Sequence, residues 1–238
     1  MRPLLALFVL LPCAAFAGAW GLDAGLVGGV GMARFNAAPS GSPPPADPTN
    51  LFSLYPPSVA ASGGAGLAGE AGIELTLHRK RRFSASLQVL WRGESLGMDE
   101  TLTFPSGTTL NRTTLWEWSG VAFPLELSYS HPLSAGQGWA LLGRAGAGAW
   151  YQKNEAWSKH LSSGASNLAQ KWDGPPDDWG PLVGLGLDWL ALPSGKRVCS
   201  FEVRATQGRA QVDPAAGGDQ GVWTLGGVLS VPVHLWVL

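Results

Sequence analysis

The sequence has few charged residues, because Asp, Glu, Lys and Arg make up only 14% of its 238 residues. A water-soluble domain generally has about a quarter, so much of this protein's surface is expected to face something other than water. Long hydrophobic runs are also missing, since no stretch of about 18 apolar residues occurs after the N-terminal segment. Membrane-spanning helices are therefore not expected.

Cysteine is scarce too, and the two residues present are Cys13 and Cys199. Cys13 lies in a segment expected to be removed, so Cys199 alone can form neither an intramolecular disulfide nor a cysteine zinc site. A lipoprotein, with Cys13 as the acylated residue, is disfavoured because Pro12 stands where a small residue is needed. The four histidines lack the spacing of metal ligands. Neither a metal site nor a cofactor is predicted.

Residues 1–17 have the order of a secretory signal. Arg2 supplies a minimal basic region, Leu4–Leu11 forms the apolar core, and Ala15-Phe16-Ala17 provides the small residues of a cleavage site. Cleavage is expected after Ala17, which leaves residues 18–238 as the mature domain.

Two runs near the middle of the chain, Val121–Tyr129 and Trp139–Tyr151, alternate between two faces. In the first run every second residue is large and apolar, and those between are small or polar, which indicates a strand with one apolar face. Each run is long enough to cross a bilayer as a tilted strand, which takes about 9–11 residues. The Ser130–Gly138 segment between them is predicted to be a short link.

Eight runs share this two-faced pattern, and we expect each of them to be a strand. They are about Ala19–Phe35, Ala65–Leu77, Phe83–Arg92, Val121–Tyr129, Trp139–Tyr151, Trp179–Ala191, Arg197–Thr206 and Gly221–Leu238. The segments predicted to be the longer loops are Asn36–Gly64, Gly93–Leu115, Lys153–Asp178 and Gln207–Gln220. An even number of antiparallel strands, with short turns at one end and longer loops at the other, is typical of a bacterial outer-membrane barrel. The predicted fold is an all-β, eight-stranded antiparallel up-and-down transmembrane β-barrel.

The two faces decide between a membrane barrel and a soluble ligand-binding barrel. A soluble barrel has a charged exterior, whereas here the non-apolar face is mostly Gly, Ser and Ala and suits a narrow interior. The apolar face is continuous, and an aromatic girdle is predicted near the strand ends. Its members are Trp20, Trp91, Tyr129, Trp139, Tyr151, Trp179, Trp189 and Trp223.

Charged residues on the inner face form a predicted structural cluster without a catalytic role. Its members are Asp23, Glu70, Glu74, Arg92, Glu126, Arg144, Asp188, Glu202 and Arg204. If the link is centred near Ala135, Glu126 lies directly across from Arg144. Charges in a confined interior should be paired, because an unpaired buried ion costs several kcal/mol. The expected interior is therefore salt-bridged, polar and plugged.

The central hairpin, residues 121–151, also resembles a known family. Its first strand reads Val-Ala-Phe-Pro-Leu-Glu-Leu-Ser-Tyr, and its second reads Gly-Trp-Ala-Leu-Leu-Gly-Arg-Ala-Gly-Ala-Gly-Ala-Trp-Tyr. This is similar to the outer membrane protein β-barrel domain families, the OmpA/OmpX-like and PorT-like small barrels. In them a Pro-Leu-x-Leu-x-Tyr strand leads through a short turn into a Gly-rich strand. Such barrels usually end in an aromatic residue, whereas this chain ends Leu235-Trp236-Val237-Leu238, with the aromatic two positions earlier.

Two clusters invite a functional interpretation. Small barrels include lipid A deacylases and palmitoyltransferases that use Ser and His near a rim, and the nearest cluster here is Tyr129-Ser130-His131. A nucleophile needs an oriented base within reach, so we interpret this cluster as a solvated periplasmic turn. The basic run His78–Arg82 could contact nucleic acid or anionic lipid, but is interpreted as a charged turn that keeps one barrel end in water.

The predicted function is that of an integral outer-membrane barrel with a structural or surface-interaction role and no enzymatic activity. The expected partners are outer-membrane lipid, lipopolysaccharide and the barrel-insertion machinery, with an unidentified surface ligand and no nucleic acid. The alternatives are a lipid A-modifying enzyme, a narrow pore and, least favoured, a soluble periplasmic ligand-binding barrel.

Overall fold

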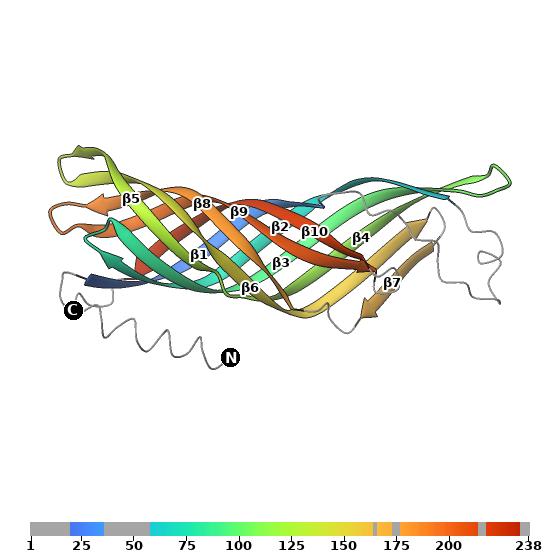
Figure 1. The fold of residues 1–238 in the computed structure, drawn as a ribbon, viewed down its shortest axis with the longest axis horizontal. Coiled ribbons are helices and arrows are strands. Elements are labelled where there is room, and N and C mark those ends of the chain that lie inside the picture. The colour runs from blue at the N-terminus through green and yellow to red at the C-terminus, as the bar shows by residue number, and fades with distance from the viewer. Residues whose placement is uncertain (1–19, 36–57, 164–165, 173–176, 214–217, 234–238) are drawn as a thin grey trace.

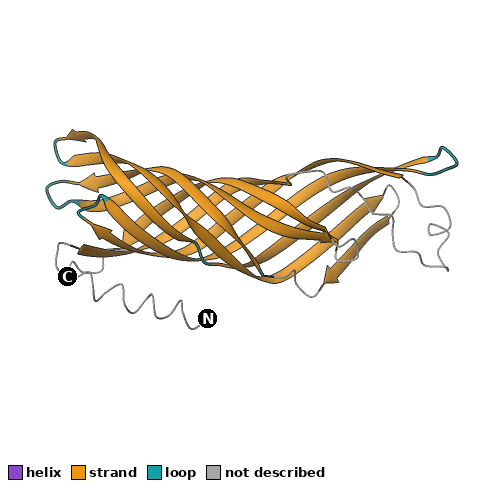
Figure 2. Ribbon diagram, viewed as in Figure 1, coloured by secondary structure: helices purple, strands orange, loops and turns teal. Residues whose placement is uncertain are grey.

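The computed structural model describes residues 20–35, 58–163, 166–172, 177–213 and 218–233. The expected signal segment 1–17 and the C-terminal residues 234–238 lie outside this range. Almost everything described is β-strand (Figure 2). The strands are β1 (Trp20–Phe35), β2 (Ser58–Arg79), β3 (Phe83–Thr103), β4 (Thr109–Ala122), β5 (Leu125–Gly136), β6 (Trp139–Ser163), β7 (Ser166–Trp172), β8 (Asp178–Ala191), β9 (Lys196–Asp213) and β10 (Gly218–Val233).

The strands form one closed antiparallel ring. The chain passes from β1 through β2 and β3 to β4 and β5, which together make one wall strand, and then through β6, β8 and β9 to β10. β10 pairs with β1 from Ala24↔Val233 to Phe35↔Val222, which closes the ring. Eight wall strands result, and each follows its neighbour in sequence, so the fold is the predicted all-β, eight-stranded antiparallel up-and-down barrel.

Short turns lie at one end of the barrel, on the left in Figure 1. They connect β2 to β3, β5 to β6 and β8 to β9. From the opposite end, which we call the loop end, the β3–β4 hairpin and the β6–β7 pair extend beyond the other strands (Figure 1). In the described part of the chain no helix is long and apolar enough to cross a membrane.

Several segments predicted to be loops are in fact strand. Residues 58–64 belong to β2, the β3–β4 hairpin turns only at residues 104–108, and β6 continues from Lys153 to Ser163. β7 pairs with this extension, and β9 and β10 also extend into the predicted Gln207–Gln220 loop. The predictions failed because polar, Gly-rich sequence still forms strand where a neighbouring strand continues the ladder, so pairing context overrides propensity.

The central hairpin also differs from its prediction. The wall strand is interrupted at Phe123 and Pro124, between β4 and β5, although the chain there still bonds to both neighbours. The Pro124 carbonyl accepts a bond from the Gln88 amide at 2.9 Å, and the Phe123 amide donates to the Tyr151 carbonyl at 2.7 Å. The predicted Ser130–Gly138 link is mostly strand, because β5 runs to Gly136 and the turn lies only at the next two residues.

Candidate functional site

The distribution of burial is the reverse of that in a soluble protein. Large apolar side chains lie on the outside, for example Val30 at 77% exposed and Leu67 at 72%. Carboxylates lie inside, and Glu74, Glu126 and Glu202 are each 2% exposed. Because burial of charge is costly unless it is paired, the pairing of these interior groups is the main question about the site.

Arg204 on β9 lies at the centre of the interior cluster. Its Nε donates to Glu202 at 3.0 Å, and its Nη1 donates to Gln88 at 2.9 Å and to Glu70 at 3.3 Å. Its Nη2 lies 3.9 Å from a carboxylate oxygen of Glu126. One guanidinium therefore connects groups from β2, β3, β5 and β9, as its fixed fork of five donors allows.

Arg144 on β6 is the second interior cation. It forms an ion pair and a hydrogen bond with Glu202, and its Nη1 lies 3.8 Å from Asp188. The predicted cross-strand pair of Arg144 with Glu126 is wrong, because Arg144 lies opposite Ser130 and Glu126 lies opposite Gly148. The turn lies further along the chain than was assumed, and a bulge shifts the register between Pro132 and Ser134.

Glu74 on β2 forms a further layer nearer the turns. Its Oε1 accepts from Arg197 at 2.6 Å, from Thr76 at 2.9 Å and from Ser230 at 3.1 Å, and its Oε2 accepts from Gln88 at 2.9 Å. This carboxylate is therefore held by donors from β2, β3, β9 and β10. Hydrogen bonds to ionised groups are among the stronger protein hydrogen bonds.

The mouth at the turn end is occupied by Asp23, His78 and Arg81. Arg81 forms an ion pair with Asp23, and His78 Nε2 lies 3.7 Å from the same carboxylate. Gly21 makes room for this arrangement, because a Cβ at that position would collide with the His78 ring. Arg81 also has a positive φ of 56°, as does Lys80 with 49°, so the turn adopts a conformation that is uncommon for side chains of this type.

Arg92 on β3 forms a separate group towards the loop end. It donates to Glu94 and, through Nη2, to Thr224 at 2.9 Å and Thr206 at 3.1 Å. The guanidinium carbon also lies 4.9 Å from the ring centroid of Trp150, within the range of a cation–π contact.

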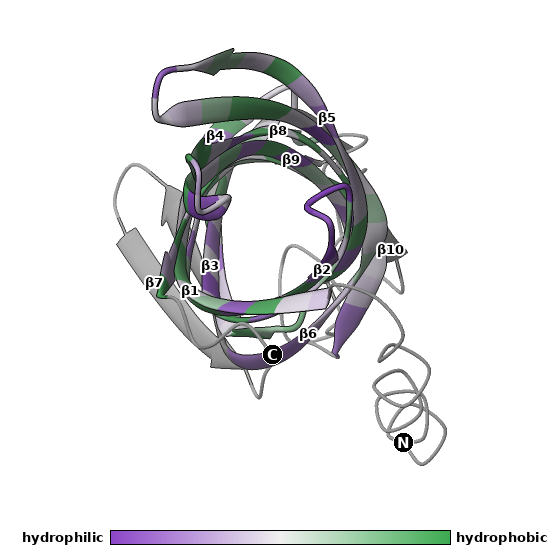
Figure 3. Cartoon of the chain, turned by 90° about the vertical axis from the view of Figure 1, so that its left-hand side faces the viewer, coloured by the Kyte–Doolittle hydropathy of each residue, from purple (hydrophilic) through white to green (hydrophobic). Residues whose placement is uncertain are grey.

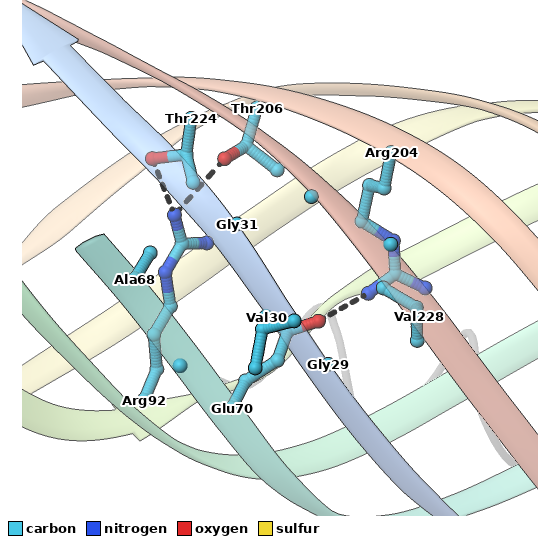
Figure 4. A pocket seen from close by; sticks show the side chains of 13 residues that line it. Gly29, Val30, Gly31, Ala68, Glu70, Arg92, Arg204, Thr206, Thr224 and Val228 are labelled. Carbon is cyan, nitrogen blue, oxygen red and sulfur yellow. Dashed lines mark hydrogen bonds and ion pairs between the residues drawn. The ribbon is translucent and has the colours of Figure 1, made fainter. Parts of the chain in front are cut away.

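Figure 4 shows the narrow space between Arg92 and Arg204, with Glu70 and the two threonines around it. Gly29 and Gly31 line its wall, and the cavity has a volume of about 20 Å³. Such a volume is comparable with the space that one water molecule requires. The space cannot hold an organic ligand in this conformation.

All nine residues of the predicted cluster point into the barrel. They do not form a single cluster but several groups at different levels along the barrel, and most partners come from different strands. The predicted cluster did not include Glu94, Gln88, Arg197 and Trp150, which all face the interior. The alternation of side chains along a strand could have indicated Glu94, because it lies two residues after Arg92 and so on the same face. It was left out because its segment was predicted to be a loop. Across the described residues, no three His, Cys, Asp or Glu side chains gather as metal ligands.

Ser130 and His131 do not form a solvated turn as predicted. Both lie within β5, where Ser130 is buried and its hydroxyl donates to Asp188 at 3.3 Å, while His131 is exposed. Consecutive strand residues point to opposite faces. The imidazole is therefore on the wrong side of the sheet to act as a base for this serine.

The predicted girdle residues lie on the outside of the barrel, near the two ends of the strands. Towards the turns, the rings of Trp139 and Trp189 are 6.2 Å apart, and those of Phe83 and Tyr129 are 5.1 Å apart. The remaining girdle member at this end is Trp20, which is half-buried. The aromatic residues thus form two belts. We call the belt near the turns, made of Trp20, Phe83, Tyr129, Trp139 and Trp189, the turn-end belt.

The loop-end belt contains Trp91, Tyr151, Trp179 and Trp223, all at least 40% exposed. Tyr151 stacks against Phe123, with ring centroids 6.2 Å apart. Between the two belts, none of the described outward-facing residues is Asp, Glu, Lys or Arg. Aromatic belts that flank an uncharged apolar band are typical of a barrel wall in lipid.

No family model matches the sequence, and no curated protein does either. Solved structures that are similar to the chain include the outer membrane protein OprG of Pseudomonas aeruginosa, with 12% identity and a TM-score of 0.37, over 92% of this chain and 99% of that one. The N-terminal β-barrel domain of OprF from the same organism has 12% identity and a TM-score of 0.30, over 90% and 99%. Ail, the attachment invasion locus protein of Yersinia pestis, has 10% identity and a TM-score of 0.33, over 90% and 99%.

These solved structures are outer-membrane proteins, the class of barrel to which the central hairpin was likened above. The eight-stranded barrel itself is established by the pairing of the chain's own strands and not by these similarities.

Proposed function

We propose that the protein is an integral β-barrel of a bacterial outer membrane, with a closed polar interior and a structural or surface-interaction role. The observation that carries the proposal is the uncharged apolar band between two aromatic belts around a closed ring. In lipid every backbone polar group must be paired, and closure of the ring achieves this. The expected signal peptide supports export to that membrane.

The interior chemistry supports a closed barrel rather than a pore. Arg144, Arg197 and Arg204 each reach across to carboxylates of other strands. An eight-stranded barrel has an interior just wide enough for its side chains. Ion pairs that cross this interior leave little room for a continuous path of water. A binding role is therefore assigned to the β3–β4 hairpin and the β6–β7 pair, which extend beyond the loop-end belt and would contact lipopolysaccharide or a surface partner.

Membrane residence is tested by heat-modifiability of the outer-membrane fraction on a denaturing gel. We expect the unboiled protein to migrate differently from the boiled protein, because a folded membrane barrel resists detergent until it is heated. A protein that stays in the soluble periplasm and shows no shift would instead be a soluble barrel. Lipid A from a deletion strain should keep its acylation, and a changed pattern would favour the enzymatic alternative.

Closure is tested in planar bilayers. Replacing Arg144 with alanine removes one cationic partner from Glu202 and from Asp188, so we expect higher single-channel conductance than in the unmodified protein, together with lower stability. Lys153→Ala is the matched control, because Lys153 lies on the exposed outer face of β6. An Arg144→Ala barrel with unchanged conductance and unchanged stability would contradict the closed, salt-bridged interior.

A further inference from the structure

The exposed charges at the turn end of the barrel are all basic among the described residues. Arg79, Lys80 and Arg82 lie in and beside the β2–β3 turn, and Lys196 lies at the β8–β9 turn on the other side of the ring. The carboxylates nearest this end, Asp23, Glu74 and Asp188, are all buried. Figure 3 looks onto this end and shows hydrophilic turns around the mouth.

The loop end differs in its charge. Arg34 and Lys153 are exposed there, but so are Asp99, Glu117 and Asp177. The whole chain carries a formal net charge of −1, so it has no general attraction to anions. Any attraction of anions to the turn end must therefore come from the basic residues gathered there, three of which belong to the β2–β3 turn.

The basic residues of this turn lie at the level of the turn-end belt. The Arg79 guanidinium is 6.0 Å from the ring centroid of Trp20, and Phe83, which directly follows Arg82, packs against Tyr129. Aromatic belts of membrane barrels lie at the headgroup level. The cations therefore lie at the depth of lipid phosphates and not in free solution.

The interior carboxylate nearest this turn is paired with Arg81, so Arg79, Lys80 and Arg82 can remain exposed to solvent or lipid. Among the arginine and lysine side chains of residues 79–82, Arg81 is the one that turns into the mouth, where it pairs with Asp23. The positive φ angles of Lys80 and Arg81 belong to the tight turn in which the Arg82 amide donates to the Arg79 carbonyl at 3.0 Å. The chain thus places one cation inside and keeps three on a fixed, exposed turn.

We propose that Arg79, Lys80 and Arg82 form a binding site for the headgroup of an anionic phospholipid, such as phosphatidylglycerol, in the leaflet next to the turns. The proposal rests on the proposed function, because it requires the barrel to span a membrane with its turns facing the periplasm. Polybasic segments next to a membrane are attracted to anionic lipids, and each cation near the surface adds to that attraction. Arginine is suited to phosphate because its guanidinium can donate two parallel hydrogen bonds.

The test uses the whole protein refolded into vesicles, with brominated lipids as quenchers of tryptophan fluorescence. The quantity measured is the binding of brominated phosphatidylglycerol relative to brominated phosphatidylcholine. We expect Lys80→Asn/Arg82→Gln to lower this preference by about tenfold. Arg34→Gln/Lys153→Gln is the matched control, because it removes the same charge at the opposite end and should leave the preference within about twofold. Asparagine is chosen at position 80 because it tolerates a positive φ.

Three outcomes would overturn the proposal. The two double variants could lower the preference equally, which would mean that only net charge matters, or neither could lower it. The preference could also disappear when inorganic phosphate is added at the same ionic strength as a chloride control, which would make the turn a site for free phosphate. Failure of the proposed function looks different, because the protein would then not insert into either type of vesicle or show heat-modifiability.

Discussion

Replacement of Arg204 by methionine is expected to lower the free energy of unfolding by about 3–5 kcal/mol, the usual cost of removing one partner from a buried ion pair. Arg204 is almost fully buried and holds Glu202, Glu70 and Gln88, with Glu126 at 3.9 Å. Methionine fills much of the same space but leaves these carboxylates with fewer donors. Urea unfolding in lipid vesicles, followed by tryptophan fluorescence, measures the change.

Two variants complete this experiment. Arg34→Met removes the same charge from an exposed position of β1 and should change the free energy of unfolding by no more than about 0.5 kcal/mol. Arg204→Lys keeps the charge but cannot reproduce the fork of donors, so an intermediate loss is expected. If Arg204→Met were as stable as the unmodified protein, the interior ion pairs would not contribute to the stability of the barrel.

Replacement of Leu185 by arginine is expected to cost about 2–4 kcal/mol of folding free energy in lipid vesicles, because it places a charge in the middle of the lipid-facing band. Leu185 is 68% exposed and lies on β8 between Trp179 and Trp189, which belong to opposite belts. The same substitution on the surface of a soluble barrel would be harmless or would improve solubility. A loss of folding free energy would therefore indicate a membrane barrel, and the absence of a loss would indicate a soluble one.

The control is Leu110→Arg, on the β3–β4 hairpin beyond the loop-end belt. Leu110 is 39% exposed, but water surrounds this hairpin if the barrel spans the membrane as proposed, so the arginine should have little effect. Equal losses at both positions would mean that the apolar band between the belts is not the part in contact with lipid.

The faces of the strands could be predicted from sequence because they depend only on local alternation. Asp188 and Glu202 were assigned to the inner face from their neighbours alone, and the structure places them there. Alternation has a period of two on every strand, so it survives errors of several residues in the strand ends. The same insensitivity explains why the fold was predicted correctly although four predicted loops are partly strand.

The partners of each charge could not be predicted in the same way. Glu126 was expected opposite Arg144, but a bulge after Pro132 and a later turn changed the register, and Arg144 pairs instead with Glu202 of β9. The ion pair of Arg197 with Glu74 joins residues 123 positions apart, across the interior of the barrel. Such pairs depend on how the closed ring is staggered, which the alternation along each strand does not reveal.

The seam between β1 and β10 has a consequence for how the protein is made. β1 and β10 are neighbours, so the final edge of the ring cannot be paired until β10 has been synthesised and delivered. Until then two rows of backbone donors and acceptors remain open, and lipid cannot satisfy them. Contacts between the two ends of a chain also form slowly, because a long loop must close before they add stability. A chain shortened before β10 would therefore fail to form the barrel at all, and would not merely lack one strand. The open strand edges of the incomplete chain must be shielded until β10 pairs with β1.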